Sequence, residues 1–174
     1  MTKKELRAFV KEQFQSQGFS SEKSYLYKII DGDYLIGFHL YPSTHCEGYS
    51  FICGIIYLPD PYKIPLRGLF DLEWSFRFPV HPDGELDLDN FRDPSRYTTV
   101  LEYENYSQED VKRYFSMNYE HFVLPLFDKE YGLKLFREDW RLMNRFSAQT
   151  IEKLCKRASL DTQAVLRYLG KSTH

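Results

Sequence analysis

Two acidic side chains, Asp71 and Glu73, stand two residues apart in a run that alternates apolar and polar residues. In an extended strand, such positions share one face. Paired carboxylates in different environments can divide the acid and base steps of a hydrolysis. On a solvated face they are instead solubilising charges, with Arg77 as a counter-ion. We favour the second interpretation, and the pair supports an alternative in which the protein is a small hydrolase-like enzyme.

Histidine and cysteine side chains, which are the usual zinc ligands, also lie close together in the sequence. His45, Cys46 and Glu47 are consecutive, and His39 and Cys53 fall in adjoining strand-like runs. Their spacing matches no common zinc pattern. Cys53 also stands in an apolar run, where a thiol packs as a small hydrophobic group. We therefore predict no metal site and no cofactor.

The segment 83–90 carries alternating carboxylates, which resemble the oxygen ligands of a calcium loop. The twelfth position counted from Asp83 is Pro94 and not glutamate, so we expect a solvated loop. The chain contains no G-x-S-x-G, phosphate-binding loop, dinucleotide fingerprint or H-E-x-x-H pattern. We assign no catalytic residue, and we favour a protein that is not an enzyme over the hydrolase-like alternative.

The strands that would position these groups are indicated by residue alternation and by turns. In the run 69–78, apolar even positions alternate with polar odd positions from Phe70 onward, which predicts a strand with one buried and one wet face. Asp31-Gly32 between two β-rich runs predicts a hairpin over 25–41. Further strands are expected over 49–58 and 97–103.

Helices are expected at both ends of the chain. Thr2 and Glu5 form a capping box before an apolar stripe, and Gly18 suits the end of this helix. Ser107 caps a second helix, and a third is expected over 133–146, followed by 148–157 and 161–169. Strands followed by helices, without βαβ alternation, indicate an α+β fold: an N-terminal helix, an antiparallel sheet of about five strands and C-terminal helices. We expect one domain over 1–146 and a short helical tail over 147–174 packed on it.

The N-terminal half resembles a bacterial domain of unknown function. The resemblance rests on the Leu6–Phe14 stripe, Gly18-Phe19, the Tyr25–Tyr41 hairpin and the Tyr49–Leu58 strand. It implies a helix that ends in Gly-Phe and continues into a strand meander. It covers about a third of the chain and implies no activity, so no catalytic residue is transferred.

The tail has the apolar spacing of a helix-turn-helix and is locally basic, with Lys153, Lys156, Arg157, Arg167 and Lys171. Ser159 stands where such motifs usually have glycine. Two helices that cap the core explain the same pattern. We favour the structural cap, and DNA binding through this helix pair is an alternative.

Composition narrows the class of protein. The net charge of −2 and the pI of about 6.2 make nucleic acid an unfavoured partner. The odd number of cysteines, three, favours a reducing compartment, and with no signal peptide or membrane span we expect a cytoplasmic protein. The chain has 14 Tyr, and tyrosine is enriched at binding surfaces.

We therefore predict a non-enzymatic binding or regulatory protein with a protein partner, of which an immunity-type role is one version. The binding residues that we single out lie on the predicted sheet: Tyr25, Tyr27, Asp71, Glu73 and Arg77.

Overall fold

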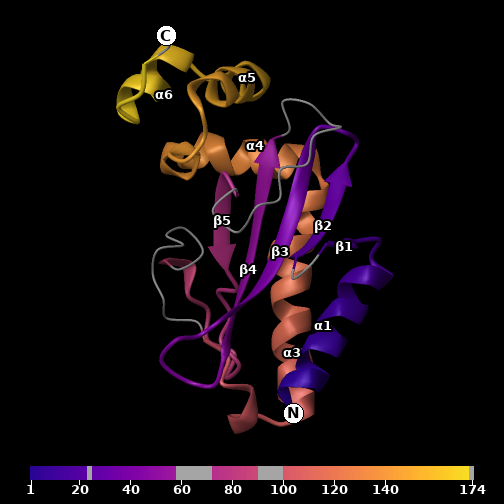
Figure 1. Ribbon diagram of the computed structural model, residues 1–174. Coiled ribbons are helices and arrows are strands. Elements are labelled where there is room, and N and C mark those ends of the chain that lie inside the picture. Colours follow the sequence, from indigo (N-terminus) through magenta and orange to yellow (C-terminus); the bar gives the residue numbers. More distant parts are fainter. Residues whose placement is uncertain (23–24, 58–71, 90–99, 173–174) are drawn as a thin grey trace. The chain divides into compact units, whose positions relative to one another are not determined.

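The computed structural model describes residues 1–22, 25–57, 72–89 and 100–172 (Figure 1). A helix, a five-stranded antiparallel sheet and a set of helices follow one another, which confirms the predicted α+β fold. The chain forms two compact units, Met1–Leu124 and Pro125–His174. The domain boundary expected between 146 and 147 stays a prediction.

The first helix, α1 (Lys3–Ser16), begins at the expected capping box. Glu5 N–H donates to Thr2 Oγ1, and Thr2 N–H donates to Glu5 Oε2 at 2.7 Å. One stripe of α1 is fully buried, and it consists of Leu6, Val10 and Phe14. Gly18 follows with a φ of 81°, the left-handed conformation that commonly ends a helix.

The sheet runs in chain order, each strand pairing with the next: β1 (Ser20–Glu22), β2 (Tyr25–Ile30), β3 (Tyr34–Pro42), β4 (Tyr49–Tyr57) and β5 (Trp74–Arg77). The predicted hairpin is confirmed, because β2 pairs with β3 around Asp31 and Gly32. Both turn residues have positive φ, 47° and 70°, as the Asp-Gly signal requires.

One strand of the sheet was not predicted. β1 is three residues long and wholly exposed, so no alternation of apolar residues marks it in the sequence. The strand expected over 97–103 lies in part outside the described residues. Its described part forms only a bridge from Leu101 to Tyr49, followed by a 3-10 turn over Tyr103–Asn105. The first residues of the run 69–78 also lie outside the described part.

Aromatic rings join the sheet to two helices on one face. α3 (Gln108–Asn118) lies beside α1 (Figure 1), and Phe9 of α1 contacts Phe115 of α3 at 5.4 Å between ring centroids. Phe14 contacts Phe38 of β3 at 4.1 Å, and Phe51 of β4 contacts the ring of Tyr114 at 5.3 Å. The abundant Phe and Tyr residues therefore build the core of this unit.

The helix that starts at Ser107 changes its winding before Pro125. A π-helical turn over Tyr119–Val123 follows α3, and a 3-10 turn then spans Leu124–Phe127. Proline lacks a backbone N–H and clashes with the preceding turn, so Pro125 accounts for the end of regular winding here.

The C-terminal unit contains three helices: α4 (Lys129–Glu138), α5 (Ala148–Ala158) and α6 (Thr162–Tyr168). The single helix expected over 133–146 is divided. α4 ends before Asp139, whose carboxylate accepts the N–H of Arg141 and starts a separate 3-10 turn, Trp140–Met143. Along the described part of the chain, none of the helices has the length and apolar character needed to cross a membrane.

Candidate functional site

The two tyrosines predicted to bind a partner lie on β2 and are half-buried. The ring of Tyr25 stacks on the imidazole of His39 in β3, with centroids 4.6 Å apart and planes 21° apart. Tyr27, two residues along on the same face, packs against an apolar cluster formed by Leu35, Ile52, Ile56 and Leu72. Both tyrosines thus contribute to this second face of the sheet as well as to the surface.

The expectation that the odd positions of the run 69–78 face water is wrong for the described part of that run. Ser75 and Arg77 are each only 5% exposed. Alternation was read as one wet face, but the second face of the sheet carries its own apolar cluster and is covered too. The expected buried positions are confirmed, because Trp74, Phe76 and Phe78 are almost fully enclosed.

The carboxylate of Glu73 accepts a backbone hydrogen bond. Its Oε2 accepts the backbone N–H of Tyr57 at 2.7 Å, where β4 and β5 approach each other. Asp71, the other member of the predicted carboxylate pair, lies outside the described residues. The hydrolase alternative therefore stays a prediction.

The pairing register places Tyr25, His39, Ile52 and Arg77 in one row across four strands. Burial lowers the pKa of His39, and the charge of Arg7 lowers it further. His39 is consequently a neutral imidazole near neutral pH. Sequence reasoning had assigned it only as a possible metal ligand, since strand register is not visible in a single sequence.

His39 and Cys53 do not approach as metal ligands. Cys53 pairs with Phe38, one residue from His39, so the two side chains point to opposite faces of the sheet. Burial raises the pKa of the Cys53 thiol, as expected for a packed thiol. Cys46 instead donates to Ser43 Oγ in the loop before β4. Within the described ranges, no group of three His, Cys, Asp or Glu residues has the geometry of a metal site.

The acidic segment after β5 folds as a tight loop. Glu85 N–H donates to Asp83 Oδ1, and Val80 bridges to Leu86. The last residue of this segment, Asn90, lies outside the described residues.

The C-terminal helices α5 and α6 are joined by three residues with well-defined geometry. Ser159 adopts the left-handed conformation, with φ 56° and ψ 41°, at the position where such turns usually have glycine. Leu160 N–H donates to Cys155 O at 2.9 Å. Asp161 then caps α6, because its Oδ1 accepts the N–H of Ala164 at 3.1 Å. The turn therefore ends α5 with a left-handed residue, as many helices do, with serine in the place where glycine is usual.

Several contacts hold this helix pair on α4 and on the segment that follows α4. Arg137 Nε donates to Ala158 O at 2.9 Å, which satisfies a carbonyl at the end of α5. Lys171 Nζ donates to Phe146 O at 2.7 Å, and Trp140 meets Tyr168 edge to face at 5.6 Å. The buried positions of the pair are Ile151, Leu154, Cys155, Ala158, Val165 and Leu166.

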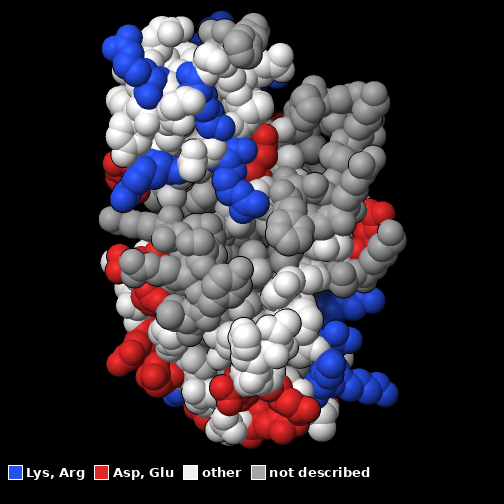
Figure 2. All heavy atoms as spheres, turned by 60° about the vertical axis from the view of Figure 1, so that its left-hand side comes forward, with Lys and Arg blue, Asp and Glu red and all other residues white. Residues whose placement is uncertain are grey.

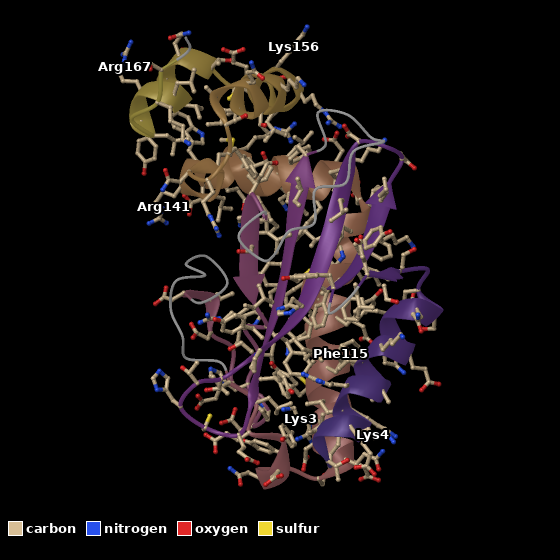
Figure 3. All side chains as sticks on the ribbon, viewed as in Figure 1. Lys3, Lys4, Phe115, Arg141, Lys156 and Arg167 are labelled. Atoms are coloured by element: carbon tan, nitrogen blue, oxygen red, sulfur yellow. The ribbon has the colours of Figure 1, made fainter. Side chains whose placement is uncertain are left out.

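The two units carry opposite net charges. Residues 125–174 contain ten Lys and Arg against six Asp and Glu, a net charge of +4. Residues 1–124 contain 13 Lys and Arg against 19 Asp and Glu, a net charge of −6. Figure 2 shows several basic side chains on one face of the C-terminal unit, and in Figure 3 Lys156 and Arg167 point outward from α5 and α6.

No family model, curated protein or solved structure matches this chain. The resemblance to a bacterial domain of unknown function therefore stays a prediction. The chemistry of the two units has to be inferred from their own residues.

Proposed function

We propose that this protein is a non-enzymatic binding protein and that its C-terminal unit binds a nucleic acid. The supporting observation is the net charge of +4 on a unit of 50 residues whose exposed cations stand on both helices of the α5–α6 pair. Lys153, Lys156 and Arg167 are all exposed. Exposed cations of a basic unit release counterions when they contact a polyanion, which gives affinity without sequence recognition.

The argument from the sequence against a nucleic-acid partner used the net charge of the whole chain. That net charge, −2, combines an acidic unit with a basic one. Screening limits electrostatic attraction at physiological salt to about 8 Å, so the local charge at the contact surface decides the interaction. A cytoplasmic location, proposed from the odd cysteine count, is compatible with this role.

Fluorescence anisotropy of the full chain with labelled duplex DNA of about two helical turns tests the proposal, at salt from about 50 to 200 mM. The double variant Lys153→Gln with Lys156→Gln should weaken binding and reduce the slope of log affinity against log salt by about 2. A matched control carries Lys4→Gln with Lys112→Gln, which removes two exposed lysines from the N-terminal unit. Absence of salt-dependent binding, or equal loss in both variants, would refute the proposal.

A protein partner is a second candidate, favoured by an edge of the sheet. Among the described strands, β1 is a terminal strand that pairs with β2, and all three of its residues are exposed. Tyr25 and Tyr27 lie on the adjoining strand, opposite Glu22 and Ser20. An extended segment of a partner can add to such an edge through backbone hydrogen bonds. Loss of a specific, stoichiometric partner in a Tyr25→Ser, Tyr27→Ser variant that keeps its fold would support this role.

A further inference from the structure

We infer that α6 reads double-stranded DNA in the major groove through a face that contains Gln163 and Arg167. The inference rests on the proposed nucleic-acid binding and specifies the partner and the residues that contact it. It requires a helix that is fixed by its own unit, an exposed face with base-reading side chains, and a charge environment that favours phosphate. The C-terminal unit meets each of these requirements.

One side of α6 is packed against the rest of the C-terminal unit. Val165 and Leu166 of α6 are buried, with 0% and 2% of their surface exposed. The turn at Ser159 and the cap at Asp161 set the start of α6, and the Trp140–Tyr168 contact holds its end. A reading helix has to be held rigidly, because a base contact depends on side-chain placement to within a fraction of an ångström.

The opposite face carries the side chains that read bases. Gln163 and Arg167 are exposed and stand four residues apart, so they lie one above the other on the same side of α6. Gln pairs in a bidentate manner with adenine, and Arg pairs with guanine, both at the major-groove edge. Arg167 points away from the unit in Figure 3.

Residues beside this face are suited to phosphate contacts. Arg157 of α5 is exposed and adds a further positive charge to the helix pair. Lys153 and Lys156 stand on the preceding helix, the element that crosses the backbone in a helix-turn-helix. Duplex RNA is a poorer fit because the major groove of an A-form helix is too narrow and deep for side chains to read.

Asp161 allows a test of which part of the unit approaches the DNA. It caps α6 and is exposed, and Asp128 caps α4 in the same way and is also exposed. Asparagine caps a helix as well as aspartate does, so Asp161→Asn and Asp128→Asn each remove one negative charge from the unit and keep the cap. If α6 lies in the groove, Asp161→Asn should tighten binding roughly fivefold, the effect of one unit charge about 4 Å away in water. Asp128→Asn should change affinity less than about twofold.

Sequence reading is tested by selecting the full chain against a pool of random duplexes and sequencing the bound fraction. The wild type should enrich a short motif and discriminate it from a scrambled duplex by roughly 5- to 150-fold. Arg167→Lys keeps the charge and loses the bidentate geometry, so it should lose most of that discrimination while affinity for the scrambled duplex stays within about twofold. Gln163→Ala should relax the motif at one position, and Gln149→Ala, an exposed glutamine on α5, is the matched control.

The outcomes separate the two proposals. Enrichment that Arg167→Lys abolishes, with the Asp161→Asn gain, supports groove reading by α6. Salt-dependent binding without enrichment, equal affinity for duplex RNA and heparin, or equal effects of the two aspartate variants overturns it and leaves nucleic-acid binding intact. Absence of binding to every polyanion overturns both.

Discussion

In the N-terminal unit, the ring of Phe14 contacts the rings of Phe19, Phe38, Phe115 and Tyr119. The buried positions of α5 and α6 in the C-terminal unit are instead aliphatic or small, and backbone caps supplied by Ser147 and Asp161 define the helix starts. The first unit is held by large interlocking rings. The helix pair α5–α6 of the second unit combines aliphatic burial with polar capping, and this unit carries a net positive charge.

The two units are therefore under different constraints. A core of packed rings tolerates little change, whereas short capped helices leave their outer faces open to charged side chains. Trp74 belongs to the first unit and Trp140 to the second, so each unit has its own fluorescent reporter. Trp140→Phe leaves Trp74 as the reporter of the N-terminal unit, and Trp74→Phe leaves Trp140.

The largest effect is expected from Phe14→Ala. Phe14 is fully buried and joins α1, β3 and α3, so its removal leaves a cavity and should lower the free energy of unfolding by about 3–5 kcal/mol. Urea unfolding followed by Trp74 fluorescence in the Trp140→Phe background measures the loss. Phe9→Ala is the control, because Phe9 is half-buried, and it should cost clearly less. Equal losses would contradict the central role of Phe14.

A smaller loss is expected from Ile151→Ala in the C-terminal unit. Ile151 is fully buried on α5, and the change should lower stability by about 2–4 kcal/mol as measured by Trp140 in the Trp74→Phe background. Ile151→Val, which removes one methylene, should cost about 0.5–1.5 kcal/mol. If Ile151→Ala cost as much as Phe14→Ala, the contrast between the two cores would fail.

Glu73→Ala should cost about 1 kcal/mol, because the partly buried N–H of Tyr57 then loses its acceptor. Glu73→Gln keeps an acceptor oxygen and should restore most of that stability. Denaturant melts of both variants decide the point. Equal behaviour of the two variants would mean that the negative charge of Glu73, and not its acceptor oxygen, holds this position.

The smallest expected effect is a loss of stability at mildly acidic pH, and it should be confined to the N-terminal unit. Burial and Arg7 lower the pKa of His39 in the folded state, so the unfolded state binds a proton more readily. Stability is therefore complete above the unfolded pKa of about 6.5 and falls as the pH drops below it. The Trp74 signal between neutral and mildly acidic pH should show this loss, and His39→Gln should flatten it. An unchanged pH dependence in His39→Gln would assign the loss to other groups.

The sequence predicted those features that depend on local chemistry. The capping box at Thr2, the Asp31-Gly32 turn and the buried side of Trp74 and Phe76 are all confirmed, because each depends on neighbours close in the chain. The prediction that Ser75 and Arg77 face water was wrong, because the burial of that face depends on a second apolar cluster whose residues come from distant strands.

The features of the candidate sites also differ in whether they depend on local sequence or on residues that are distant in the chain. The helix-turn-helix spacing and the basic residues of the tail are visible in the sequence, but the net charge of −2 does not show that two parts of the chain carry opposite charges. Only the division into two units separates that charge into −6 and +4. The Tyr25–His39 stack depends on strand register and could not be read from a single sequence.

The three cysteines differ in exposure, so their rates of reaction with a thiol reagent can report the opening of each unit. Cys53 in the N-terminal unit and Cys155 in the C-terminal unit are both fully buried, whereas Cys46 is partly exposed. Burial raises the pKa of both enclosed thiols, so a thiol reagent added to the native protein should label Cys46 first. Labelling of each buried thiol then has to wait until its own unit opens. The rates at which Cys53 and Cys155 gain mass therefore time the opening of the two units separately, within one molecule and without denaturant.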